Sequence, residues 1–204
     1  MTYSATGIVL RRQDAHEWDR FYTIYTREHG KLFLVGKGTR RPRAKLAAHV
    51  EPLHEAELEI AHGRQIDRII FARTLRTNEA FAQSHAHFTH ASFLCECVDA
   101  LTKSNHQDPA IFDLLQVALL AVRDAHPALA PAFIVRLIAL LGYAPDLRQC
   151  IECRTPFRDR PATALPHRGG ASCLPCSSPA SRGGVRGGAG MYPPPLPGGE
   201  LEGV

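Results

Sequence analysis

The sequence predicts a multi-domain α+β protein in which a five-stranded β-barrel precedes a helical domain. Three observations lead to this fold class. Hydrophobic residues alternate in period two through residues 1–77, and from Asn78 onward they recur every three to four residues. Two C-x-x-C pairs follow within residues 150–176. The 204 residues are 45% hydrophobic, which is enough to form cores in one or two domains.

Five short segments in residues 1–77 have the alternation and composition of β-strands. They cover residues 4–11, 20–26, 31–35, 52–60 and 66–75. Five short strands close into a small barrel more readily than they form an open sheet, because closure removes exposed edges. A long basic loop after the third strand favours an OB-fold, and an SH3-like barrel is the alternative.

The spacing of hydrophobic residues in 78–149 predicts a helical domain, and this segment has few charges. Asn78 is the expected cap of the first helix. The pair Asp108-Pro109 predicts the start of a second helix, with Asp as the cap and Pro at the first helical position. Pro131 is expected to open a third helix, which Gly142 ends.

The two C-x-x-C pairs are separated by 19 residues and comprise Cys150, Cys153, Cys173 and Cys176. Cysteines at this spacing turn both thiolates toward one point, so two pairs complete a tetrahedral shell of sulfur ligands. Four ligands leave no open position, and the sequence therefore predicts a structural Zn²⁺ in a finger spanning residues 150–176. Thiol redox chemistry is the alternative, which Pro175 favours, but no βαβ pattern surrounds the pair.

A second group of metal-ligand residue types lies in the first predicted helix. Its members are His85, His87, His90, Cys95 and Cys97. Because residues two apart point to different sides of a helix, we interpret these as ordinary helix positions.

The segment Gly30–Lys45 begins as a strand and continues as a basic loop punctuated by Gly36 and Gly38. No acidic residue lies between His29 and Val50. Unpaired charges are too costly to bury, so the loop must be solvated. Mobile cations and glycines that allow close backbone approach suit a polyphosphate, whereas a merely soluble surface loop is the alternative.

The positive charge is concentrated at the N-terminal end of the chain. Residues 1–77 hold 14 Lys and Arg against 9 Asp and Glu, although the whole chain has a net charge of only +4. The predicted phosphate contacts are Lys37, Arg40, Arg41, Arg43 and Lys45 in the loop, with Arg11, Arg12, Arg20 and Arg27 from the same barrel. OB barrels bind strands with cations and stacking aromatics. Candidates for stacking are Phe21, Tyr22 and Tyr25, of which alternate residues must be core.

Several features of the sequence limit the expected cellular location and the class of protein. The N-terminus lacks a signal-peptide pattern and no apolar run is long enough to span a membrane, so we expect a cytoplasmic protein without disulfides. Residues 177–204 are rich in Gly, Pro and Ser and are expected to form a tail. No phosphate-binding G-x-x-x-x-G-K-[ST] loop and no clear carboxylate cluster occurs, which argues against an enzyme.

The order of these parts resembles the RecO family. The most specific segments are LGYAPDLRQCIEC at residues 141–153 and GKGTR at residues 36–40, and the resemblance covers about residues 1–176. It implies an N-terminal OB-fold and a helical domain carrying a zinc finger. It also implies a non-enzymatic recombination mediator that binds single- and double-stranded DNA and anneals complementary strands.

The same resemblance implies partners and location. The family acts with RecR to load RecA on DNA covered by single-stranded-DNA-binding protein, in the cytoplasm and in association with the nucleoid. We expect a monomer when the chain is on its own. The alternative function is an adaptor, in which the helical domain docks protein partners and the barrel serves only as a scaffold.

Overall fold

The computed structural model describes residues 1–15, 17–77, 81, 84–124, 126–158, 160–165 and 168–177. The expected cap Asn78 and the expected tail after Ser177 lie outside these residues. The chain divides into two compact units, Met1–Ala144 and Pro145–Val204. A mixed α+β architecture with an N-terminal five-stranded sheet and a helical region after it is confirmed.

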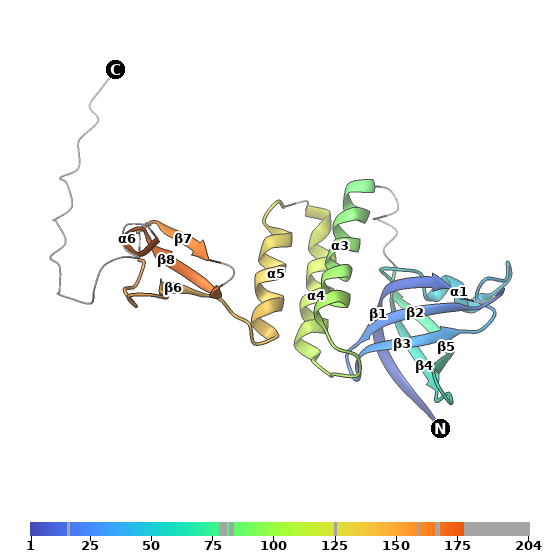
Figure 1. The fold of residues 1–204 in the computed structure, drawn as a ribbon. Coiled ribbons are helices and arrows are strands. Elements are labelled where there is room, and N and C mark those ends of the chain that lie inside the picture. Colours follow the sequence, from blue (N-terminus) through green and yellow to red (C-terminus); the bar gives the residue numbers. More distant parts are fainter. Residues whose placement is uncertain are drawn as a thin grey trace, which may run out of the picture. The chain divides into compact units, whose positions relative to one another are not determined.

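The N-terminal sheet is a closed barrel with the strand order β1-β2-β3-β5-β4. Its strands are β1 (Thr2–Asp14), β2 (Arg20–Thr26), β3 (Gly30–Gly36), β4 (Glu55–Ala61) and β5 (Asp67–Arg76), with helix α1 (Lys45–His49) between β3 and β4 (Figure 1). Strand β1 pairs with both β2 and β4, and β5 completes the ring by a short parallel pairing with β3.

The alternation of hydrophobic side chains along the strands explains how the barrel interior is filled. Tyr22 and Ile24 of β2 and Leu32 and Leu34 of β3 point into one buried core, as side chains two residues apart on a strand must. Strand β1 has a bulge between Val9 and Arg11 and continues to Asp14, beyond its predicted end at Arg11.

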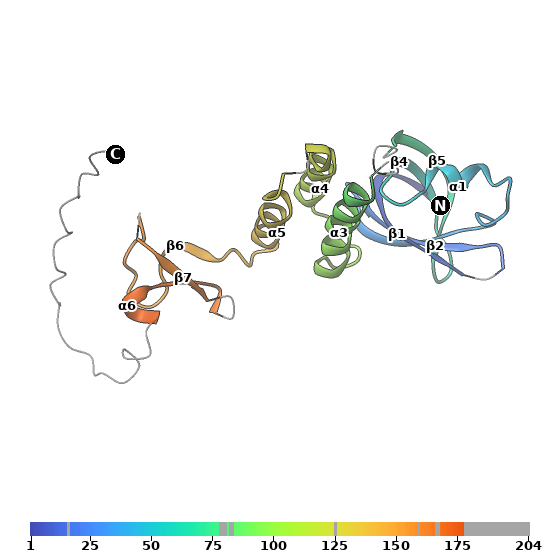
Figure 2. The ribbon, with the colours of Figure 1, turned by 90° about the horizontal axis from the view of Figure 1, so that it is seen from above.

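Three helices follow, namely α3 (His85–Leu101), α4 (Pro109–Ala121) and α5 (Leu129–Leu140), with a short 3₁₀ turn, η1 (Val122–Asp124), between the last two. They pack against one another, as the view in Figure 2 shows. Within the described residues, no helix combines the length and apolar character that crossing a membrane requires.

The helix ends confirm part of the prediction. Asp108 caps α4, because its side chain accepts hydrogen bonds from two N–H groups of the first turn, and Pro109 follows at the first position. Ser84 caps α3 by accepting from the His87 N–H. The prediction that Pro131 opens the third helix is wrong, since α5 begins at Leu129. A proline fits there because the first-turn N–H groups need no helical partner.

The barrel has its own interior core, and its outer face contributes to a second core with the helices, which the sequence predicted as a separate domain at residues 78–149 after the barrel at residues 1–77. Ile8, Leu10 and Tyr25 point outward from the barrel and join the core of α3, α4 and α5. The Tyr25 hydroxyl donates to the Asp108 carbonyl oxygen at 3.3 Å. At Gly30, with φ +69°, a Cβ atom would lie 1.9 Å from the His106 carbonyl oxygen, so the backbones approach closely here.

The second unit contains a small three-stranded sheet in the order β6-β8-β7. Its elements are β6 (Asp146–Cys150), β7 (Ala162–Leu165), β8 (Gly170–Cys173) and the one-turn helix α6 (Leu174–Ser177). Strand β8 is parallel to β6 and antiparallel to β7. The unit begins at Pro145, five residues before the predicted finger boundary at Cys150, because β6 belongs to its sheet.

Candidate nucleic-acid interface and metal site

The basic segment after β3 is anchored at its base and open at its surface. The Thr39 side chain is buried, and its hydroxyl donates to the Gly36 carbonyl oxygen at 3.0 Å. Gly38 adopts a left-handed backbone, with φ +66°. The five cations predicted here as phosphate contacts are all exposed: Lys37, Arg40, Arg41, Arg43 and Lys45. The loop is therefore a solvated basic surface on a fixed backbone.

A second loop, between β1 and β2, lies against the basic segment. The Arg40 backbone N–H donates to the Trp18 carbonyl oxygen at 3.0 Å, and the Gly38 N–H donates to Asp19 Oδ1 at 2.8 Å. The Arg41 guanidinium lies over the Trp18 ring, 5.9 Å from its centroid. We call residues 15, 17–19 and 37–45 together the loop pair.

Two carboxylates balance part of this positive charge. Lys37 Nζ lies 2.8 Å from Asp19 Oδ2. Asp14 lies between two arginines, with Arg20 Nε at 3.1 Å and Arg40 Nε at 3.5 Å. Sequence reasoning missed Trp18, Asp14 and Asp19 as parts of this surface.

The structure does not bring all predicted phosphate contacts together. Arg20 and Arg40 meet at Asp14 beside the loop pair. Arg12 pairs with Glu51, close to α1.

Arg11 and Arg27 instead face the helices. Arg11 lies 3.4 Å from Asp99 of α3, and Arg27 lies 3.1 Å from Asp113 of α4. The Arg27 guanidinium also lies over the Phe112 ring, 5.7 Å from its centroid. These two arginines connect the barrel to the helices and lie apart from the loop pair.

Replacing Asp14 with Asn is expected to raise the affinity of the loop pair for polyanions about two- to fivefold. Arg20 and Arg40 would then not have to give up their ion pairs with the Asp14 carboxylate before they bind a phosphate. Competitive binding to a polyanion such as heparin at low and high salt measures this. Asp124→Asn, an exposed site on η1 with the same charge change, is the matched control. Equal affinities of the two variants would contradict the role of Asp14.

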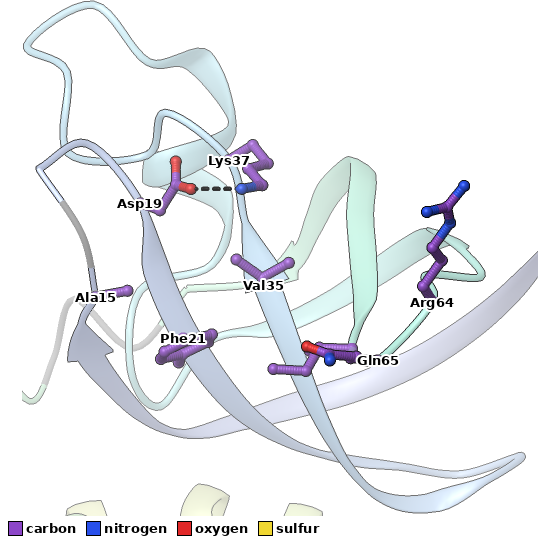
Figure 3. A pocket seen from close by; sticks show the side chains of 8 residues that line it. Ala15, Asp19, Phe21, Val35, Lys37, Arg64 and Gln65 are labelled. Atoms are coloured by element: carbon purple, nitrogen blue, oxygen red, sulfur yellow. Dashed lines mark ion pairs between the residues drawn. The ribbon is translucent and has the colours of Figure 1, made fainter.

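Beside the loop pair, a pocket of about 530 Å³ opens over β2 and β3. Figure 3 shows Phe21 and Val35 on the neighbouring strands, the Lys37–Asp19 ion pair at one end, and Arg64 and Gln65 from the β4–β5 loop across from them. Of the three aromatic candidates, Tyr22 and Tyr25 are buried and Phe21 is left accessible.

Sequence reasoning missed Arg64 and Gln65. The sequence signal for this turn was Gly63, which lies between two predicted strands and marks the turn that carries Arg64 and Gln65. Gly63 is tightly placed, since a Cβ atom there would lie 1.9 Å from the Ile66 carbonyl oxygen. This turn carries the two polar side chains to the pocket.

The four cysteines of the second unit converge. Their sulfur atoms all lie within 4.8 Å of one another, and Cys153 Sγ lies 3.7 Å from Cys173 Sγ. A tetrahedral shell with Zn–S bonds of about 2.3 Å has sulfur–sulfur edges of about 3.8 Å. The geometry therefore fits a four-coordinate metal ion, as the spacing predicted.

The thiol pKa values of the cluster move in opposite directions, lowered for Cys150 and Cys153 and raised for Cys173 and Cys176. Burial alone would raise the pKa of Cys150, but N–H groups of Cys153, Cys173 and Glu152 donate to its sulfur and lower the pKa to about 6. The pKa of Cys176 is raised to about 12, first by its hydrogen bond with Cys173 and then by burial. Four thiolates this close repel one another, and a bound dication removes that repulsion.

The histidines and cysteines of α3 do not form such a cluster. Among the described residues, the four cysteines of the second unit make up the one group of three or more metal-ligand side chains. Cys95 is buried in the helical core, and burial raises its pKa to about 12.

Comparison with known proteins extends over both units. Residues 1–78 match the family model described as Recombination protein O N terminal, and residues 84–190 match that of Recombination protein O C terminal. A protein of Pelotomaculum thermopropionicum, named DNA repair protein RecO, is 33% identical over 176 residues, which cover 85% of this chain and 68% of the relative.

Two further relatives carry the same name. The protein of Moorella thermoacetica is 32% identical over 192 residues, covering 90% of this chain and 72% of the relative. The protein of Cutibacterium acnes is 30% identical over 189 residues, covering 88% and 76%. Together with the two family models, which match nearly the whole described part, these similarities show that the chain belongs to the RecO family.

Proposed function

We propose that this chain is a recombination mediator in DNA repair that binds single- and double-stranded DNA through the loop pair. The exposed cations of residues 37–45, held on a fixed backbone in a RecO-family chain, carry the proposal. Phosphate neutralisation by Lys and Arg supplies sequence-independent affinity and accounts for binding to both forms of DNA.

We further propose that the N-terminal barrel is an OB-fold. The strand order β1-β2-β3-β5-β4, the pairing of β1 with two neighbours and the helix between β3 and β4 support this assignment. OB-folds bind oligonucleotides on the face of strands 2 and 3 and on the loops after strands 1 and 4. The pocket lies in this region together with the β1–β2 half of the loop pair, and the basic half follows β3 beside it.

Annealing of complementary strands requires no catalytic group in this proposal. Two strands repel each other as polyanions, and cations on one surface lower that repulsion when both strands lie beside it. The mediator is accordingly non-enzymatic. In the cell it acts on nucleoid DNA in the cytoplasm, where it works with RecR to load RecA on DNA coated by single-stranded-DNA-binding protein.

The metal in this proposal is a structural Zn²⁺ held by Cys150, Cys153, Cys173 and Cys176. Four sulfur ligands leave no position for a substrate, so the ion stabilises the fold of the second unit. Zn²⁺ would supply a cross-link between β6, the turn that follows it, β8 and α6, which together carry the four thiols.

An adaptor is the second candidate function. Val117 and Leu120 of α4 and Val135 of α5 are exposed apolar side chains, which favours contact with a protein partner. In this case the chain would still be a monomer alone, but DNA affinity would be weak and nearly independent of salt.

Fluorescence anisotropy of labelled single-stranded and duplex DNA at several salt concentrations separates the two functions. If the five loop cations each neutralise one phosphate, the logarithm of single-strand affinity should fall with the logarithm of salt with a slope of about −3.5. The chain should also accelerate the annealing of complementary strands under the same conditions, and fluorescence quenching measures the annealing rate. A flat salt dependence would reject DNA binding and favour the adaptor.

A further inference from the structure

The outer face of β2 and β3 is divided into a covered and an open part. Side chains that alternate with the barrel core point to this face. At one end, Tyr25 is buried against the helices and Lys31 Nζ lies 3.3 Å from Asp99 Oδ1 of α3. At the other end, Phe33 is 44% exposed, and Phe21 is half-buried and lines the pocket.

The two open phenylalanines form an aromatic pair. Phe21 of β2 lies opposite Val35 of β3, and Phe33 is two residues before Val35 on the same face. Their ring centroids are 5.0 Å apart with an interplanar angle of 31°. Phe33 is exposed and Phe21 is half-buried, and a flat ligand that stacks on their accessible surface would remove that surface from water.

Polar and cationic groups surround this pair. Lys37 lies at one end of the adjoining pocket, and Arg64 and Gln65 line it from the β4–β5 loop (Figure 3). Trp18, also exposed, stands in the neighbouring loop beneath Arg41. Accessible aromatic rings with a cationic rim are complementary to a nucleobase attached to a phosphate backbone.

We propose that Phe21 and Phe33 form a stacking platform for unpaired nucleobases, and that this platform makes the chain favour single strands over duplexes. The inference rests on the proposed DNA binding and deepens it. Bases in a duplex are stacked on one another and present only their edges, so they cannot reach the platform. Phosphates are available in both forms, so the loop pair alone binds both.

The test measures anisotropy with single strands, duplexes of the same length and single strands whose central nucleotides are abasic. Wild type should bind the intact single strand at least about fivefold more tightly than the abasic strand, because each lost stacking contact weakens binding by about that factor or more. Phe21→Leu/Phe33→Leu should lose this preference. Its duplex affinity and its salt slope should stay at the wild-type values.

Two further variants separate stacking from folding. Phe33→Trp keeps a ring at an exposed position and should retain the preference, whereas Phe33→Leu should weaken it without changing the melting temperature. Equal binding of intact and abasic strands by wild type would overturn the platform while leaving DNA binding in place. Failure to bind any of the three DNAs would overturn both proposals.

Discussion

Replacing Lys37, Arg40 and Arg41 with Glu is expected to reduce DNA affinity on the order of 100-fold or more at moderate salt. Each of the three cations is exposed on the loop pair, so each substitution removes one phosphate contact and adds one repulsive carboxylate. Single-stranded and duplex DNA should be affected alike, since both present the same phosphates. Anisotropy titration at several salt concentrations measures the loss, and circular dichroism checks the fold.

A second variant of the loop pair separates the loss of attraction between the cations and phosphates from the repulsion that new carboxylates add. Replacing the same three residues with Gln avoids a new carboxylate beside Asp19, which lies 2.8 Å from Lys37 Nζ. Because single strands contribute about 0.7 to the slope per phosphate contact, the salt slope should become shallower by about two.

The matched control moves the same charge change to the helical region. Lys103, Arg123 and Arg136 are exposed there, and their replacement with Glu changes the net charge of the chain equally. This control should lose far less affinity than the loop variant. Equal losses would mean that net charge, and not the loop pair, governs binding.

Removing the metal is expected to unfold the second unit and leave the first unit intact. Among its described residues, the buried apolar core of the second unit is limited to Cys150, Phe157, Ala171 and Cys173. Such a core is too small to offset the entropy of ordering the segment. Binding of structural zinc to small domains contributes about 10–16 kcal/mol in apparent terms, and this energy would be lost.

Elemental analysis and proteolysis measure this prediction. Purified protein should hold one zinc per chain, and Cys150→Ser/Cys153→Ser should hold none and become sensitive to proteases after residue 144. DNA affinity should stay close to wild type, because the loop pair belongs to the first unit. Cys97→Ser, a half-buried thiol of α3, is the control that should keep its zinc.

Two results would contradict the metal assignment. Zinc retained by the double Ser variant would mean that the ion binds elsewhere. A metal-free wild type that forms a Cys153–Cys173 disulfide on oxidation would favour the redox alternative, since these sulfurs already lie 3.7 Å apart.

Local sequence patterns were sufficient to predict a structural feature where the residue types and their spacing allow only one local structure. Alternation along 20–26 predicted a strand, and Tyr22 and Ile24 do point into the barrel core. Asp108 before a proline predicted a helix start and caps α4. The two C-x-x-C spacings predicted a cluster of four sulfurs, which lie within 4.8 Å of one another. In each case the determining contacts are local or repeated.

Long-range packing decided the composition of the candidate nucleic-acid surface. Arg11 and Arg20 look alike in sequence, yet Arg11 faces Asp99 of α3 and Arg20 lies at Asp14 beside the loop pair. No local pattern distinguishes them, because the difference depends on which part of the barrel the helices cover.

The sequence by itself therefore determined the strands, the start of α4, the basic loop and the cysteine cluster. Only the tertiary structure decided that Tyr25 is covered while Phe21 stays open, and that Trp18 and Arg64 approach the same surface as Lys37. Period-two alternation tells which side chains share a face of a strand. It does not tell what packs on that face, because the packing elements come from distant parts of the chain.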